Sequence, residues 1–396
     1  GDMPRLFIVA AKRTAFGAFG GKLKGLTATE LAVHSTRAAL AAGNVPPEVV
    51  DSVTVGNVQQ TSEDAAYLAR HVALKTGMRE STPALNVNRL CGSGFQAVVT
   101  AAHEILLGEC EVAVAAGTES MSQAPMSAYG HEVRFGSRLG VNIQLRDTLW
   151  AGLTDSHAGC PMGITAENLA ADYSISRPAS DEYALASQSR WKAAQQAGAF
   201  AAEIAPLELK GKKGVEVFGT DEHPRDTTLE RMSQLPTTFK KNGVVSAASA
   251  SGICDGAATL VVASGEAVAK HKLTPLCEVV SWASVGVDPT RMGIGPVPAI
   301  RAALCKAGMS LAQMDRVEIN EAFAPQVLAC AQELHLDMSK LNINGGAIAL
   351  GHPLGASGAR ITAHLAHAIA NREIKTAVGA ACIGGGQGIA IVLKAA

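Results

Sequence analysis

Cys91 is the residue whose surroundings best suit a nucleophile in this sequence. It lies in the segment Asn88–Gly94, which follows a run expected to form a strand and precedes a run expected to form a helix. The unpaired N–H groups and the positive dipole end at the start of a helix favour a thiolate. The nearby glycines would let a substrate carbonyl approach the backbone. Most buried cysteines are small apolar packing residues, however, so Cys91 alone leaves both interpretations open.

Three further side chains of suitable chemistry stand at the ends of predicted strands or at turns. Asn320, His352 and Cys382 each follow a short strand-like run, and sites in α/β sheets form where strands end. Taken singly, the asparagine could cap, the histidine could satisfy a core hydrogen bond and the cysteine could pack. Together with Cys91 they form a Cys/His/Cys/Asn constellation. The runs that they follow are Val317–Ile319, Ala347–Leu350 and Thr376–Ala381.

The elements that would position these residues occur twice. Leu354–Gly358 nearly repeats Leu90–Gly94, an offset of 264 residues (354 − 90), and Gly355 stands where the first copy has Cys91. The same offset holds without a gap over a long stretch, with the matched apolar positions in one register. A repeat of this kind predicts a duplicated domain in which one copy alone carries the nucleophile. Further matches join Arg37–Leu40 to Arg301–Leu304 and Asp51 to Asp315.

Alternating strand-like and helical runs define the organisation of the chain. They extend over residues 6–120 and return from residue 296 to the end, which predicts a largely parallel α/β sheet. Residues 121–245 hold polar loops and have no counterpart in the repeat. We therefore expect three parts, which are an N-terminal α/β half (1–120, completed by 246–272), an inserted loop domain (121–245) and a C-terminal α/β half (273–396).

Composition excludes several classes of protein. With 396 residues, 47% hydrophobic but only 4% aromatic, the chain can build a large aliphatic core. A net charge of −1 removes the electrostatic case for binding nucleic acid or an anionic membrane. No run reaches the roughly 18–20 apolar residues of a membrane span. The eight cysteines include no Cys-x-x-Cys pair, so free thiols are expected. Strand-like sequence begins near Leu6, and we expect neither a signal peptide nor a presequence.

The motifs around the four candidate residues resemble those of the thiolase family. Its signatures are Asn-x-x-Cys-x-Ser-Gly, Asn-Glu-Ala-Phe, Gly-His-Pro and Cys-x-Gly-Gly-Gly, and all four occur here in the same order. The resemblance extends over essentially the whole chain. The motif sequences are most similar to those of the mitochondrial-type 3-ketoacyl-CoA thiolases, which are acetyl-CoA acyltransferases. In this sequence the motifs occupy residues 88–94, 320–323, 351–353 and 382–386.

This resemblance implies a fold and a reaction. The fold would be an α/β thiolase-like structure, with two duplicated halves forming a layered α-β-α-β-α core and an inserted loop domain. The reaction would be thiolytic cleavage of 3-ketoacyl-CoA by CoA in fatty-acid β-oxidation, or its reverse, a Claisen condensation. Cys91 would be the nucleophile, His352 the base that activates it, and Cys382 the general acid.

The resemblance also implies residues that bind the substrate. Asn320, through a water, and His352 would stabilise the enolate oxygen, while the backbone N–H groups of Cys91 and Gly384 would hold the tetrahedral oxyanion. Coenzyme A enters as a substrate, and neither a metal nor a bound cofactor is expected. The residues implied to contact CoA or the acyl chain are Arg225, Ser251, Met162 and Phe323.

Several alternatives remain within and outside the family. Pro161 stands where biosynthetic enzymes usually carry histidine and favours the degradative type, but an acetoacetyl-CoA thiolase restricted to four carbons stays open. Ser249 stands where the family's Asn-Ala-Ser-Gly block usually has asparagine. A ketosynthase would carry a second histidine in place of Cys382, and a noncatalytic CoA-binding protein would be expected to lack one of the reactive residues.

A metal site is the remaining chemical alternative, and assembly and location follow only by analogy. His364 and His367 have a suggestive spacing, as do His157 and Cys160, but His367 is matched by His103 in the repeat, which favours core packing. The family forms dimers or tetramers, and residues 126–140 resemble its tetramer-forming segment. The expected location is the mitochondrial matrix in a eukaryote and the cytoplasm in a bacterium.

Overall fold

A mixed β-sheet forms the centre of the protein in the computed structural model, which describes residues 2–396. Within these residues its strand order is β14-β15-β16-β13-β1-β12-β5-β3-β4, and β2 pairs with β12 beside this path. The strands are β1 (Leu6–Arg13), β2 (Gly17–Ala18), β3 (Ser52–Gly56), β4 (Ala84–Val87), β5 (Val112–Ser120), β12 (Cys254–Ser264), β13 (Cys277–Gly286), β14 (Arg316–Ile319), β15 (Thr376–Ile383) and β16 (Gln387–Lys394).

The strand directions correct the prediction of a largely parallel sheet. Only β3 with β4, β3 with β5, and β14 with β15 are parallel among the pairings of this sheet in the described residues. β12 and β16 each add antiparallel pairs on both of their edges. The prediction was wrong because alternating strands and helices do not reveal neighbouring strands that a short turn joins into an antiparallel pair. β15 and β16 are such a pair, joined by the turn Gly384–Gly386.

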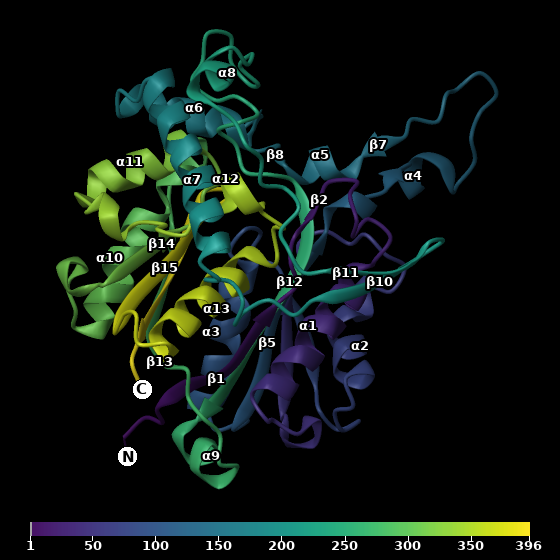
Figure 1. Ribbon diagram of the computed structural model, residues 1–396. Helices are drawn as coiled ribbons and strands as arrows, with labels where there is room; N and C mark the ends of the chain where they lie inside the picture. The colour runs from purple at the N-terminus through teal and green to yellow at the C-terminus, as the bar shows by residue number, and fades with distance from the viewer. Residues whose placement is uncertain (1) are drawn as a thin grey trace.

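The helices produce five layers (Figure 1). α1 and α2 pack on one part of the sheet, α10 and α11 on the other, and α3 and α13 lie side by side between the two parts. Three apolar clusters fill the spaces between the layers, one under α1 and α2, one on both sides of α3 and α13, and one under α10 and α11, since alternate strand residues point to opposite faces. The helices are α1 (Ala28–Ala42), α2 (Leu68–Lys75), α3 (Ser93–Leu106), α10 (Pro296–Ala307), α11 (Ala324–Leu334) and α13 (Ser357–Ala370).

Strand β5 shows how the pattern of the sequence builds these layers. Val114 and Ala116 belong to the cluster under α1 and α2, whereas Ala113 and Ala115 belong to the central cluster around α3 and α13. Aromatic side chains are scarce, so small aliphatic residues fill both clusters. The layered α-β-α-β-α arrangement expected from the sequence is confirmed.

The internal repeat has a structural counterpart with the same offset. α3 begins at Ser93 and α13 at Ser357, and both helices have 14 residues. The parallel pairings correspond as well, because Val53 lies opposite Val114 in one half and Val317 lies opposite Val378 in the other. The two copies therefore share their pairing register as well as their residue types.

Between β5 and β12 the chain forms helices of 4 to 20 residues and two-stranded ribbons outside the layered core. In Figure 1 the β10–β11 ribbon and the segment around α4 extend away from the rest of the molecule. The domain boundaries expected from the sequence stay a prediction. The elements are β6 (Met126–Ser127), α4 (Gly130–Val133), β7 (Arg146–Asp147), α5 (Thr148–Gly152), β8 (Thr154–Asp155), β9 (Cys160–Pro161), α6 (Met162–Asp172), α7 (Arg177–Gln196), β10 (Leu207–Gly211), β11 (Gly214–Phe218) and α8 (Leu229–Ser233).

Two local predictions near the candidate site need correction. The run Ala347–Leu350 is the one-turn helix α12 and not a strand, because four apolar residues fit either structure. Cys382 lies inside β15 instead of after it. The short helix α9 (Gly265–Lys270) links the two halves of the chain. None of the helices in residues 2–396 is long and apolar enough to cross a membrane.

Candidate active site

Cys91 lies in a tight turn between β4 and α3. Leu90, directly before it, has a φ of 46°, a left-handed conformation that is uncommon outside glycine. Two side chains hold this turn, since Leu90 N donates to Asn88 Oδ1 (2.9 Å) and Ser93 Oγ donates to Leu90 O (2.7 Å). The turn directs Cys91, which is partly exposed, to the first turn of α3.

The Cys91 thiol is neutral in the free protein at neutral pH. Burial raises the pKa of Cys91 to about 11, the N–H groups of Gly384 and of Cys91 itself act in the opposite direction, and the negative charge of Glu119 raises it further. A thiolate would therefore form by transfer of the proton to a base. The contact with the Gly384 N–H also shows that the turn after β15 reaches the Cys91 sulfur.

His352 is the imidazole at this site. It is buried, its Nδ1 lies 2.5 Å from Ser357 Oγ, and its backbone N–H donates to Gly252 O at 2.8 Å. Burial, with a smaller effect of Arg360, lowers the pKa of His352 to about 3. The ring is therefore neutral at physiological pH and has a nitrogen free to accept a proton.

Asn320 and Cys382 come from neighbouring strand ends. Asn320 follows β14 and its Nδ2 lies 3.4 Å from His352 Nε2, while its Oδ1 is buried with no hydrogen-bond partner among the described residues. Burial raises the pKa of Cys382 well above its usual value, and proximity to Cys91 raises it further. Two thiols of opposite halves therefore meet here, and the buried one stays protonated at neutral pH.

Gly384 opens the turn between β15 and β16. A Cβ on Gly384 would lie 3.1 Å from Met162 Sδ, so this residue has little room for a side chain. Met162 and Phe323 belong with Phe239 and Cys382 to one apolar cluster. The structure thus gathers Gly384 and the two residues expected to line the acyl or pantetheine path around the buried thiol.

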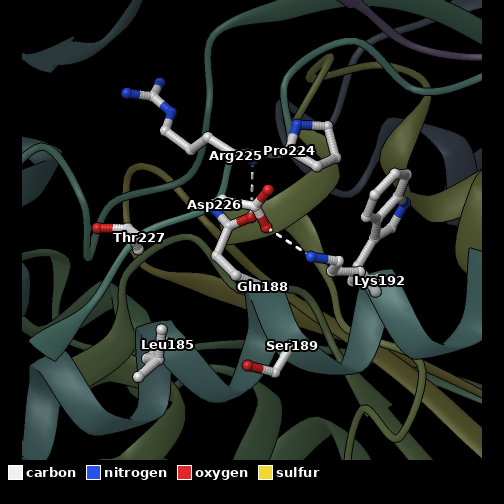
Figure 2. A pocket seen from close by; sticks show the side chains of 9 residues that line it. Leu185, Gln188, Ser189, Lys192, Pro224, Arg225, Asp226 and Thr227 are labelled. Atoms are coloured by element: carbon white, nitrogen blue, oxygen red, sulfur yellow. Dashed lines mark hydrogen bonds and ion pairs between the residues drawn. The ribbon is translucent and has the colours of Figure 1, made fainter.

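Ser251 and Arg225 lie farther along the same surface. Ser251 N donates to Ala322 O (2.9 Å), and the next residue, Gly252, packs against the ring of His223. The chain from His223 leads to Arg225, which is exposed and lines a pocket of about 270 Å³ on α7. Figure 2 shows the Arg225 side chain extending away from a neighbouring ion pair in this pocket. That pair joins Lys192 to Asp226 at 2.9 Å.

Two site residues were missed by the sequence analysis. Ser357 fixes the imidazole of His352, and Glu119 bonds to backbone near both halves of the site. The repeat contains a signal for Ser357, because its counterpart Ser93 also stabilises a turn. Glu119 has no such signal.

Two of the histidines considered as metal ligands, His364 and His367, have protein partners instead. His364 Nδ1 lies 2.5 Å from Glu203 Oε1 and its Nε2 lies 3.0 Å from Asn344 Nδ2. His367 Nε2 bonds to Ala11 O at 2.7 Å. Among the described residues no group of three or more histidine, cysteine, aspartate or glutamate side chains is arranged to hold a metal ion.

Comparison with known proteins decides the family. The thiolase N-terminal domain matches residues 6–266 and the thiolase C-terminal domain matches residues 273–395. The chain belongs to the thiolase family. This confirms the resemblance inferred from the four motifs and excludes the competing ketosynthase assignment.

Relatives of this thiolase include two groups of named enzymes. It is 59% identical to the mitochondrial 3-ketoacyl-CoA thiolase of Mus musculus over 390 residues, which cover 98% of each chain. It is 46% identical to an acetyl-CoA acetyltransferase of Cupriavidus necator, with 99% of this thiolase and 100% of the relative covered.

Solved structures agree with these relatives. The crystal structure of human mitochondrial 3-ketoacyl-CoA thiolase matches with a TM-score of 0.97 and 58% identity, covering 99% of both chains. The structure of the human enzyme in complex with CoA matches with a TM-score of 0.96 and 57% identity, covering 99% of this thiolase and 98% of that chain.

Proposed function

We propose that this thiolase cleaves 3-ketoacyl-CoA with CoA, giving acetyl-CoA and an acyl-CoA shortened by two carbons, in a reversible reaction. The observation that carries the proposal is the proximity of two thiols, Cys91 and Cys382, in a protein whose buried, neutral His352 contacts Asn320 at the end of the neighbouring strand β14. The identity of 58–59% to enzymes named 3-ketoacyl-CoA thiolase supports the choice of substrate.

The first half-reaction forms an acyl-enzyme. His352 accepts the Cys91 proton, and the sulfur attacks the 3-keto carbon to form a tetrahedral oxyanion. The bond between carbons 2 and 3 then breaks, leaving the acyl group on Cys91. The electron pair remains on acetyl-CoA as an enolate, and Cys382 donates its proton to carbon 2. Cys382 is a suitable acid because burial keeps it protonated.

The second half-reaction transfers the acyl group. Cys382, now a thiolate, takes the proton of the incoming CoA thiol, whose sulfur attacks the thioester on Cys91. The Cys91 sulfur leaves and recovers its proton from His352. The N–H groups of Cys91 and Gly384 bind the oxyanion in both half-reactions, and loss of one such donor typically costs about 10²–10³ in rate. A water held by Asn320, together with His352, binds the thioester oxygen when the enolate forms.

Coenzyme A binds along the surface that leads from Arg225 to Ser251. The guanidinium of Arg225 suits a phosphate or the adenine face, and Ser251 lies beside the pantetheine. Met162 and Phe323 pack against the apolar part of the substrate, next to Cys382.

A thiolase restricted to acetoacetyl-CoA is the second candidate. The relative named acetyl-CoA acetyltransferase has 46% identity, against 59% for the mouse 3-ketoacyl-CoA thiolase. Pro161 at the start of α6 also favours the degradative type. Activity that extends beyond four carbons separates the two candidates.

The enzyme assembles as a homodimer or homotetramer. The segment between β6 and α5 carries exposed apolar side chains that a partner copy would cover. Its location is the mitochondrial matrix if the source is eukaryotic, and the cytoplasm if it is bacterial. The exposed side chains are Met126, Tyr129, Phe135, Leu139, Val141, Ile143 and Leu145.

The test is a series of kcat/KM values for 3-ketoacyl-CoA substrates from four to sixteen carbons, with CoA as the second substrate. We expect turnover beyond four carbons and a covalent acyl group on Cys91 detectable by peptide mass spectrometry. Cys91→Ala should lose on the order of 10⁴-fold or more in kcat. Normal cleavage by this variant would refute the mechanism, and activity confined to acetoacetyl-CoA would refute the chain-length assignment.

A further inference from the structure

Glu119 is a fully buried carboxylate at the end of β5 that no step above uses. It accepts hydrogen bonds from four donors on two separate loops. Its Oε1 accepts from Val58 N (3.1 Å) and Gly355 N (2.9 Å), and its Oε2 accepts from Gln59 N and the Asn57 amide, both at 3.0 Å. Four donors to one buried carboxylate form a rigid junction.

One side of this junction leads to Cys91. Val58 O accepts a hydrogen bond from Asn88 Nδ2 (3.1 Å), and Asn88 Oδ1 accepts from Leu90 N (2.9 Å) in the turn that carries the thiol. Val58 and Cys91 also pack against the same apolar cluster. The loop that Glu119 fixes is therefore a support of the Cys91 turn.

The other side leads to His352. Gly355 lies inside the turn that runs from His352 to Ser357, and Pro353 O accepts from Ser357 N at 3.1 Å. Ser357 Oγ in turn contacts His352 Nδ1. The hydrogen bond from Gly355 to Glu119 thus ties this turn to the other half of the protein, in addition to the bond from His352 N to Gly252 O.

The backbones of the two halves pack so closely beside Glu119 that neither can move without disturbing the other. A Cβ on Gly117 would lie 2.0 Å from Gly355 O, and a Cβ on Gly355 would lie 2.6 Å from Thr118 O. The two halves therefore touch through bare backbone, with no side chain between them to take up a shift. The repeat offset puts Ile383 opposite Glu119, so one copy alone supplies this carboxylate.

We propose that Glu119 is a positioning residue, whose carboxylate holds the turn of His352 in register with Cys91 and places a negative charge beside the turn that carries the Cys91 thiol. The effect on turnover rests on the function proposed above. The effect on thiol reactivity does not, since it requires no substrate.

Electrostatics near Glu119 support both parts. Burial raises the pKa of Glu119 to about 7, the N–H donors oppose this shift, and the charge of Asp255 adds to it. Glu119 in turn raises the pKa of Cys91. Between pH 8 and 11, where Cys91 begins to ionise, Glu119 is charged. Removing the charge should therefore make the thiol more reactive.

Glu119→Gln tests the proposal, because it keeps the shape but replaces one acceptor oxygen with an NH₂ group that faces backbone N–H donors. We expect kcat to fall at least about 10-fold with KM for CoA within about 2-fold. Alkylation of Cys91 by iodoacetamide at pH 9, followed by peptide mass spectrometry, should become about 3- to 10-fold faster, equivalent to half to one unit of thiol pKa. General loss of structure would also expose the thiol and speed alkylation, so the comparison requires that the buried Cys277 stay unalkylated in Glu119→Gln under the same conditions.

Asp255→Asn is the matched control. It removes an equally buried carboxylate near Glu119 that bonds to Ser122 and not to Gly355, so kcat and alkylation should stay within about 3-fold of wild type. Glu119→Asp, which keeps the charge but retracts the acceptors, should lower kcat without faster alkylation and also serves if Glu119→Gln does not fold.

Turnover of Glu119→Gln within about 3-fold of wild type would refute the positioning role, and unchanged or slower alkylation would refute the effect of the charge. Loss of activity in Asp255→Asn equal to that in Glu119→Gln would also refute a specific role. If wild-type enzyme cleaved no 3-ketoacyl-CoA, the proposed function would fail, while the alkylation comparison would still test Glu119.

Discussion

Burial keeps Cys91, His352 and Cys382 uncharged in the free enzyme. The pKa of each thiol is raised and that of the imidazole is lowered. Each group therefore keeps its uncharged form, which has the smaller desolvation cost in a site shielded from water. Protons would then move only when substrate supplies a site for negative charge. This avoids a buried thiolate–imidazolium pair in the resting enzyme.

The buried histidines also predict how stability depends on pH. Burial lowers the pKa of His352 to about 3 and that of His223 to about 4, from an ordinary 6.5. Below pH 6.5 these histidines bind protons in the unfolded chain but stay neutral in the folded protein. The free energy of unfolding that they contribute is fully present above pH 6.5 and is lost as the pH falls toward 4. At pH 5 this amounts to about 1–2 kcal/mol for His223.

His223→Gln should therefore lose about 1–2 kcal/mol less than wild type between pH 7.5 and pH 5, as measured by urea denaturation. The exposed His157 offers a control, and His157→Gln should follow the wild-type curve. Parallel curves for His223→Gln and wild type would mean that His223 is not a source of acid sensitivity.

At the scale of residues, the sequence predicts the groups that stand in unusual local motifs. Cys91 and His352 each adjoin glycine or proline, and Cys382 stands two residues before Gly384, which marks turns where side chains can reach a site. Glu119 could not be found in this way, because it lies in a strand and its role depends on contact with Gly355. Which two thiols meet is likewise a matter of tertiary structure.

Among the elements, α3 and α13 form a close contact between the two halves. A Cβ on Gly94 would lie 2.3 Å from Ala359 N, and a Cβ on Gly358 would lie 2.3 Å from Phe95 N. The first turns of both helices thus touch through backbone, which brings two positive dipole ends together near Cys91. A negative charge developing on substrate benefits from both.

Gly94→Ala and Gly358→Ala should each destabilise the protein by about 1–3 kcal/mol, because an added methyl group must push the helices apart. Turnover should fall by at least about 10-fold, since the same turns carry the site. Gly25→Ala is the control, as nothing lies within 4 Å of a Cβ there, and it should leave both properties unchanged. A Gly94→Ala protein with wild-type stability would contradict the close contact.

The repeat allowed the elements of one half to predict those of the other, and α3 and α13 begin at equivalent residues. Two predictions were wrong, each for a physical reason. Ala347–Leu350 forms a helical turn because it is too short for periodicity to decide, and Gly351 with a φ of 102° ends it. The prediction of parallel strands was wrong because the residue pattern determines which face of a strand is buried but not the direction in which the strand runs.

For the whole molecule, Arg13 at the end of β1 joins parts that are distant in sequence. It is fully buried and bonds to Glu203 (2.7 Å) and Asp221 (2.8 Å), and Glu203 also contacts His364 on α13. Burial alone would raise the pKa of Glu203, but His364 and Arg13 lower it to about 2. The cluster links the central layer to the segment that leads to Arg225.

Arg13→Met should cost about 3–5 kcal/mol, because it leaves buried carboxylates without their cation. Arg5→Met, just before the other end of β1, removes an exposed arginine paired with Glu278 and should destabilise the protein far less than Arg13→Met. Thermal denaturation of both variants against wild type measures the difference. Equal losses would show that the buried cluster contributes no more than a surface pair.

The position of β12 between β1 and β5 has a consequence for biosynthesis. β1 and β5 are complete once residue 120 has left the ribosome, yet the strand that joins them begins only at Cys254. At about 5–20 residues per second, translation leaves these two strand edges unpaired for roughly 7 to 27 seconds. A nascent chain of this enzyme is therefore exposed to aggregation at that stage, and a chaperone that shields strand edges would act there.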